Sequence, residues 1–144
     1  MTSVVELRLL ADRVEAATGP DRELDCVIAV AALGFFEVPP RWEGAPIGYG
    51  YIDADGAEVR PGQGGDQLVR HFTTSLDAAM TLVPEGAEFL VSSCRPGLIA
   101  FARGPSAVVG FFENAEASGL GSAATPALAL CAAALRAQAS TVQP

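Results

Sequence analysis

The sequence predicts one α+β domain over residues 1–144, with two amino-terminal helices, a short central helix, a mainly antiparallel sheet and a carboxy-terminal helix. Near both ends of the chain, apolar residues recur at the three-to-four spacing of a helix. Between them lie apolar runs of strand length, separated by breaks of three residues rich in glycine and proline. Such short breaks can only join antiparallel neighbours, so the strands should form a meander.

The first two helices should span about residues 4–17 and 21–33 and pack as an antiparallel hairpin. Gly19 ends the first helix and Pro20 opens the second, as is typical of a tight helix–helix corner. Each helix has one apolar face, made by Val4, Leu7, Leu10, Ala11 and Val14 in the first and by Leu24, Val27, Ile28, Ala31 and Ala32 in the second. The hairpin should therefore cover one side of the fold.

Helical periodicity is lost in an irregular, aromatic-rich segment that spans about residues 34–72. A segment of this length without regular structure is usually functional or mobile. Its glycines, prolines and aromatic residues predict, in order, a loop over 38–46, a short strand at Tyr49 and Tyr51, a turn over 53–56, a returning strand over 57–60 and a glycine-rich loop over 61–66.

A short helix should follow, within residues 70–86. Thr74 and Asp77 have the spacing of a capping box at a helix start. Pro84 cannot continue the helix and Gly86 releases the chain, which limits the helix to about two to three turns. Its expected apolar stripe consists of Leu76, Ala79, Met80 and Val83.

The second half of the chain predicts three strands, at residues 88–94, 98–103 and 107–113, and then a loop of small residues over 114–124. The middle strand is almost entirely apolar, as a central strand covered on both faces would be. Thr125 caps the last helix, which is apolar on nearly every side as far as Leu135. This helix is either buried between layers or partly an oligomer interface, and we expect a homo-oligomer.

Two of these stretches resemble a known family. The run from Arg70 to Gly86, with Ser75-Leu76-Asp77-Ala78-Ala79 and Leu82-Val83-Pro84, and the helix start at Thr125–Leu130 are similar to the hallmarks of the phage ABA sandwich domain family. The amino-terminal helices, with Gly19–Asp25 between and within them, fit the same pattern. The resemblance implies a three-layer α-β-α sandwich and a phage or prophage origin. It brings no catalytic motif, because the function of the family is unknown.

Composition narrows the class of protein. The chain has 17 acidic and 9 basic residues, a formal net charge of −8, and every basic residue is arginine. This charge disfavours direct binding to long nucleic acids. No apolar run approaches the ~20 residues that cross a bilayer, and no signal peptide is visible, so we expect a cytoplasmic protein of the infected bacterial host. The odd, widely spaced cysteines Cys26, Cys94 and Cys131 should be buried thiols in a reducing compartment.

The motifs of catalysis and metal binding are weak. His71 is the only histidine, and it could join Asp77 or Glu88 and a serine, but it is more simply a structural group or a pocket lining. The run from Asp53 to Gly56 lacks the later ligands of a calcium loop and reads as a turn. The glycine patterns at 62–65 and 119–124 read as linkers. The sequence therefore predicts no catalytic residues, no metal site and no cofactor, although it does not decide whether the protein is an enzyme.

The candidate ligand-binding residues lie in or next to the irregular middle of the chain. Aromatic rings can stack on a base, and arginines can hold phosphates by paired hydrogen bonds. The alternative is that the rings pack and the arginines are solvated. The candidates are Arg41, Trp42, Tyr49, Tyr51, Arg60, Arg70, His71 and Phe72.

These features favour a non-enzymatic phage binding protein that evades host immunity by sequestering a nucleotide-derived signal, in the manner of a sponge. An alternative is an acidic protein–protein inhibitor of a host defence effector, such as a CRISPR or other nuclease system. A small hydrolase or a virion-associated protein is a further alternative. The expected partner is thus a nucleotide-like small molecule or a host defence protein, with no membrane and no long nucleic acid.

Overall fold

The computed structural model describes residues 3–40, 42–61, 66–92, 105–111 and 114–142. The predicted class, α+β with antiparallel strands, two amino-terminal helices, a short central helix and a carboxy-terminal helix, is confirmed. The elements are α1 (Val4–Ala16), α2 (Arg22–Leu33), β1 (Phe36–Val38), β2 (Gly48–Ile52), β3 (Glu58–Val59), α3 (Leu76–Met80), β4 (Glu88–Ser92), β5 (Ser106–Phe111), β6 (Asn114–Ser122) and α4 (Pro126–Val142).

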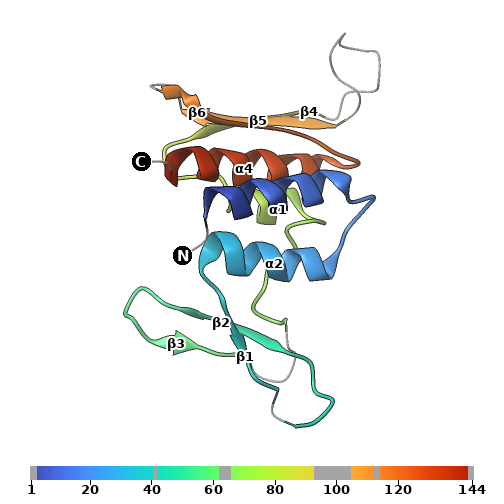
Figure 1. Ribbon diagram of the computed structural model, residues 1–144, viewed down its shortest axis with the longest axis vertical. Helices are drawn as coiled ribbons and strands as arrows, with labels where there is room; N and C mark the ends of the chain where they lie inside the picture. Colours follow the sequence, from blue (N-terminus) through green and yellow to red (C-terminus); the bar gives the residue numbers. More distant parts are fainter. Residues whose placement is uncertain (1–2, 41, 62–65, 93–104, 112–113, 143–144) are drawn as a thin grey trace.

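Within the described residues, the strands form two sheets of three strands each, in the orders β1-β2-β3 and β4-β5-β6. The four strand pairings seen in this part of the chain are antiparallel. In Figure 1 helices α4, α1 and α2 lie between the two sheets. The layers therefore run sheet–helices–sheet, whereas the α-β-α sandwich implied by the family resemblance would place the sheet between the helices.

Helices α1 and α2 form the predicted antiparallel hairpin (Figure 1). Ser3 caps α1 in a reciprocal box, because its hydroxyl accepts from the Glu6 amide at 3.1 Å and its own amide donates to the Glu6 carboxylate at 2.8 Å. Asp21 caps α2 by accepting from two amides of the first turn, and Gly34 ends that helix in the left-handed region, at φ 72°. The predicted bounds of both helices hold to within one residue.

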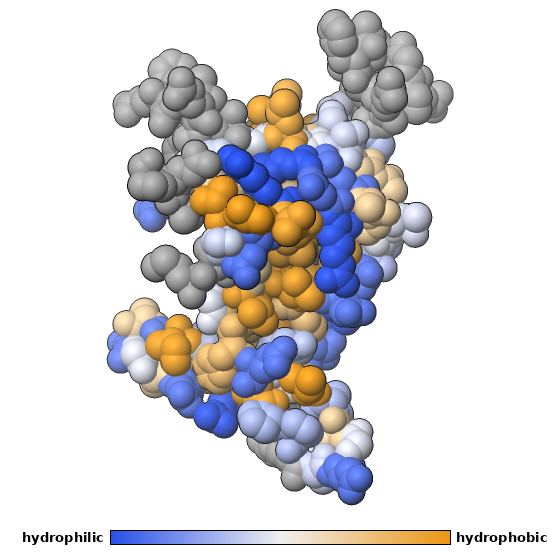
Figure 2. All heavy atoms as spheres, in the orientation of Figure 1, coloured by the Kyte–Doolittle hydropathy of each residue, from blue (hydrophilic) through white to orange (hydrophobic). Residues whose placement is uncertain are grey.

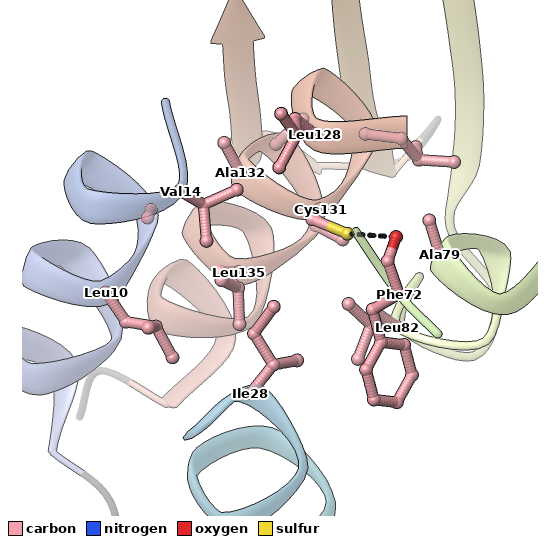
Figure 3. Close-up of a cluster of buried hydrophobic side chains, with 14 of the residues drawn as sticks. Leu10, Val14, Ile28, Phe72, Ala79, Leu82, Leu128, Cys131, Ala132 and Leu135 are labelled. Atoms are coloured by element: carbon pink, nitrogen blue, oxygen red, sulfur yellow. Dashed lines mark hydrogen bonds between the residues drawn. The ribbon is translucent and has the colours of Figure 1, made fainter. Parts of the chain in front are cut away.

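Helix α4 is the centre of the core. Every residue from Ala127 to Leu135 is buried, since the sheet β4-β5-β6 packs on one side of the helix and α1 and α3 pack on the other. Figure 3 shows Leu128, Cys131 and Leu135 of α4 among side chains from α1, α2 and α3. The Thr125 hydroxyl accepts from the Leu128 amide at 3.2 Å, which confirms the predicted cap. Of the two readings of this apolar helix, burial between layers is the one observed.

Strand β6 replaces the predicted loop over 114–124. Gly119 and Gly121 let this strand lie directly against the backbone of α4. A Cβ atom added at Gly121 would overlap the Ala129 carbonyl oxygen and lie 2.8 Å from the Ala133 nitrogen. The glycine pattern at 119–124, predicted to be a linker, therefore has a role in packing: it lets β6 and α4 lie closer together than side chains would allow.

The central helix differs from its prediction in cap and in buried face. Ser75, not Thr74, is the N-cap, because the chain has already turned at His71, whose carbonyl accepts from the Ser75 amide. The helix spans only five residues. The buried face also differs from the prediction, since Leu76 and Met80 are each 42% exposed, while Ala78, Ala79 and Leu82 are buried.

Two of the three strands predicted in the second half are observed as β4 and β5, and these two pair directly, with Leu90 opposite Val108. The expected middle strand, Leu98–Arg103, lies outside the described residues. The β2–β3 hairpin at the predicted turn is confirmed, whereas β1 was not predicted. None of the helices in the described part of the chain is long and apolar enough to cross a membrane.

Candidate ligand-binding cavity

The eight residues predicted as a ligand site do not form one cluster. Arg41 lies outside the described residues. Trp42 is 62% exposed and begins a turn, in which the Ala45 amide donates to the Trp42 carbonyl at 3.1 Å. The remaining six lie in two places: Tyr49 and Tyr51 on β2 with Arg60 directly after β3, and residues 70–72 on the loop that leads to Thr73.

The small sheet separates Arg60 from the two tyrosines, because side chains alternate between the faces of a strand. Tyr49 and Tyr51 share one face of β2, and the Tyr51 ring packs 5.3 Å from the ring of Phe35. Arg60 lies over the ring of Phe36, at 6.0 Å from its centre, and Phe36 stands opposite Gly50 on the other face. The Arg60 guanidinium also bonds the Glu58 carboxylate at 3.0 Å.

Arg70 and His71 are exposed, and their backbone lies at the start of α2, where Arg22 donates to the Arg70 carbonyl at 3.1 Å. Phe72 is 1% exposed, and in Figure 3 its ring points into the core beside Leu82. Its carbonyl accepts from the Cys131 thiol at 3.2 Å. Phe72 is therefore a core residue, and its prediction as a ligand contact is corrected.

An ion pair between the half-buried Arg22 and the buried Asp25 fixes this junction. Asp25 is 1% exposed, and its carboxylate accepts from the Thr73 amide at 2.8 Å, the Thr73 hydroxyl at 2.9 Å and the Arg22 guanidinium at 3.1 Å. Arg22 also bonds Asp66 at 2.7 Å and the Val69 carbonyl at 2.6 Å. Because all these groups satisfy one another, the cluster holds the loop before Thr73 onto α2 and has a structural role.

A cavity of about 360 Å³ opens between the first turns of α1, the stretch of α2 from Cys26 to Ala31 and the strands β1 and β2. This volume is within the range of small-molecule sites, about 300–1,000 Å³. The face in Figure 2 carries hydrophobic surface that continues from the helical layers towards the small sheet. The cavity is lined by Glu6, Leu10, Cys26, Val27, Val30, Ala31, Glu37 and Tyr49.

The cavity combines apolar walls with four groups that can contact a ligand by polar interactions. Glu37 stands directly opposite Tyr49 in the β1–β2 pairing. Burial raises the pKa of the Tyr49 phenol and of the Cys26 thiol, so both are neutral at pH 7. The hydrogen bonds from Ser3 lower the pKa of Glu6, which is therefore ionised. The lining thus presents negative charge and neutral hydrogen-bonding groups.

Among the seven predicted residues that the structure describes, Tyr49 alone lines this cavity. Among the others, Leu10, Val27 and Ala31 were assigned to the apolar faces of the two helices and Cys26 was expected to be a buried thiol, because each is ordinary in its own element. One signal was available: Val30 is apolar but lies off the buried stripe of its helix, and it is 37% exposed. An apolar residue outside the buried face of an amphipathic helix indicates that a second side of the helix contacts another part of the protein or a ligand.

A second hollow, of about 480 Å³, is lined by Arg8, Asp12, Gly119, Leu120, Arg136 and Ser140. The Arg136 guanidinium in this hollow is already bonded within the protein, to Asp12 at 2.7 Å, to Glu15 at 2.6 Å and to the Leu120 carbonyl at 2.7 Å. Across the described ranges there is no group of three or more His, Cys, Asp or Glu side chains placed to hold a metal ion. The cavity at Tyr49 is thus the stronger candidate site. Comparison with protein-family models, curated proteins and solved structures finds no match.

Proposed function

We propose that this protein is a non-enzymatic binding protein that sequesters a small host-derived molecule, with a role in phage counter-defence. The observation that supports sequestration is the cavity of about 360 Å³ at the junction of α1, α2 and the small sheet. Such mixed linings, mostly apolar with a few placed polar groups, are typical of small-molecule sites. The phage context is supported by the resemblance of residues 70–86 and Thr125–Leu130 to the phage ABA sandwich family.

The walls of the cavity belong to elements with well-defined ends. Glu6 lines the cavity and also closes the capping box of α1, and Cys26 and Val27 lie inside the capped helix α2. A site on rigid elements pays little conformational entropy when a ligand binds. This favours tight retention of a ligand, which is what a sequestering protein requires.

A nucleotide-derived signal is the ligand that the aromatic and arginine residues of the sequence favour. Tyr49 can stack on a base from within the cavity. Calorimetry with cyclic nucleotides and ADP-ribose derivatives tests this ligand. A nucleotide that binds in this cavity should bind about tenfold or more weakly to Tyr49→Ala, given the usual contribution of one base–aromatic stack, whereas a nucleotide bound elsewhere should be unaffected. Tyr51→Ala is the matched control, because Tyr51 is on the same face of β2 but outside the cavity lining, and it should bind like the wild type.

A second candidate function, inhibition of a host defence protein, is favoured by the outer face of β4-β5-β6. Leu90, Val108 and Leu120 stand side by side across the three strands and are 70%, 43% and 64% exposed. Large exposed apolar groups in one row are typical of protein interfaces. The net charge of −8 favours a partner of opposite, basic charge.

A pull-down from host lysate separates the two functions. A stoichiometric protein that is lost with Leu90→Ser and Leu120→Ser, but kept with Leu9→Ser on α1, supports inhibition; Leu9 is a fair control because it is 62% exposed. Release of a small molecule on heating, with no stoichiometric partner, supports sequestration. The hydrolase alternative would be supported if the protein turns over the ligand and if His71→Ala abolishes this turnover.

A further inference from the structure

We propose that the cavity at Tyr49 takes an organic cation: an amine or quaternary ammonium group attached to a compact hydrocarbon body. This inference rests on the proposed sequestering function and specifies the chemical class of its ligand. It departs from the nucleotide expectation, because the lining offers carboxylates where a phosphate would need arginines.

The charge of the lining is the first argument. Glu6 and Glu37 contribute carboxylates, and no arginine or histidine is among the lining residues that the structure describes. Glu6 uses one oxygen to accept from the Ser3 amide at 2.8 Å. A carboxylate has about four acceptor positions, so it can bind a cation while it keeps this bond. An anionic ligand would meet two negative charges with no compensating donor of positive charge.

The position of Tyr49 is the second argument. An aromatic face attracts ammonium groups, and quaternary ammonium sites commonly combine such a face with carboxylates. Glu37 lies directly across the β1–β2 pair from Tyr49, so the ring and the carboxylate enter the cavity next to each other. Because its phenol is neutral, Tyr49 keeps an O–H group that can accept from an ammonium N–H.

The apolar lining residues indicate the chemistry of the uncharged part of the ligand. Leu10, Val27, Val30 and Ala31 supply hydrocarbon surface from two helices. Cys26 is 7% exposed, lines the cavity, and its thiol has no hydrogen-bond partner among the residues that the structure describes. A buried neutral thiol behaves as a small apolar group with a weak donor. The inner part of the ligand should therefore be apolar, with its charge towards Glu6 and Glu37.

Cys26 also provides the assay, since a ligand in the cavity should shield it from alkylation. Cys26 is 7% exposed and lines the cavity, whereas Cys131 is fully buried and its thiol donates to the Phe72 carbonyl. The three cysteines lie on different tryptic peptides, so mass spectrometry follows Cys26 separately from Cys94 and Cys131. The probes are three cyclohexane derivatives of nearly equal shape: cyclohexylamine, cyclohexanol and cyclohexanecarboxylate. Cyclic AMP is the phosphate-bearing probe, and calorimetry measures binding of all four independently of the thiol.

We expect cyclohexylamine to bind and to slow alkylation of Cys26, with cyclohexanol about tenfold weaker and the carboxylate without effect. Glu37→Gln and Glu6→Gln should each weaken amine binding about tenfold, since each removes a charge-assisted contact. Glutamine still completes a capping box at the Glu6 position, so the fold should be kept. Glu43→Gln, an exposed acid outside the lining, is the control for net charge and should bind like the wild type.

The outcomes separate the ligand class from the function. If cyclic AMP or the carboxylate binds and protects Cys26 while the amine does not, the cationic class is overturned and sequestration of a small molecule stands. If the amine binds equally well to Glu37→Gln, Glu6→Gln and wild type, the carboxylates do not select the ligand and the inference fails. If no probe binds by either measurement, both the cationic ligand and the sequestering function are overturned.

Discussion

Replacing Gly121 with alanine should destabilise the fold, because this glycine of β6 lies directly against the backbone of α4. The new Cβ would overlap the Ala129 carbonyl oxygen, lie 2.8 Å from the Ala133 nitrogen and lie 3.2 Å from the Ala132 Cβ. Two of these neighbours are backbone atoms of α4, which cannot rotate away as a flexible side chain would. Relief requires the helix to move, and α1 packs against the far side of α4.

The size of the effect follows from known cases of overpacking. Adding one methyl group to a close-packed interior destabilises proteins by about 1–3 kcal/mol. Alanine also stiffens the unfolded chain, which offsets about 0.4–1 kcal/mol of that loss. Because the contact is with backbone, we expect a net loss of about 2 kcal/mol, or a melting temperature lower by about 8 °C for a domain of this size.

Urea denaturation followed by far-UV circular dichroism measures this loss directly. Fluorescence is less suitable, because Trp42 is 62% exposed already in the folded state. Gly19→Ala is the matched control: a Cβ there meets nothing within 4 Å, so its stability should equal or slightly exceed that of the wild type. Equal midpoints for Gly121→Ala and Gly19→Ala would refute the close contact between β6 and α4.

Three further predictions concern stability and can be read from the same denaturation curves. Asp25→Ala should cost about 1–3 kcal/mol, because it removes the acceptor of the buried Thr73 amide and one of the two carboxylates that bond Arg22, whereas Asp55→Ala, in an exposed turn, should change little. Ser75→Ala should lower the free energy of unfolding by about 1 kcal/mol, because it removes the N-cap of α3, and Thr74→Ala should lower it much less. A larger loss for Thr74→Ala than for Ser75→Ala would show that Thr74 is the cap, as the sequence predicted. A hydrogen bond from an arginine lowers the pKa of Glu15 below its ordinary 4.5, so its stabilising contribution is present above that pH and is lost as the pH falls through the lowered value. Glu15→Gln should therefore flatten the loss of stability between neutral pH and acid, and an unchanged slope would contradict the assignment.

The helices could be predicted because the information for each lies within a few residues of chain. The face of α1 made by Leu7, Leu10 and Val14 and the cap at Thr125 are local patterns, and both are observed. Strand β6 could not be predicted in this way. Its glycines and alanines have a low intrinsic preference for strands, and only the neighbouring helix α4 gives them a role.

The candidate site was less accessible to sequence reasoning for a related reason. Tyr49 was identified from its aromatic character, but its cavity is completed by residues of α1 and α2 that have unremarkable neighbours in the chain. Phe72 was assigned to the site because it precedes a helix beside His71. Its inward direction is set by the bond between Thr73 and Asp25, two residues that are 48 positions apart and show no joint pattern in the sequence.

The central place of α4 has a consequence for how the protein is made. Helix α1 buries its apolar face largely against α4, and their polar edges meet in the bond between Glu15 and Arg136, 121 positions apart. A ribosome adds residues from the amino terminus, so the first helices must wait, with their apolar faces uncovered, until the sequence of α4 has been synthesised. Contacts of such long separation slow folding and expose intermediates to aggregation. We therefore expect the nascent chain to depend on chaperones for most of its synthesis and to become resistant to protease only after α4 has been added.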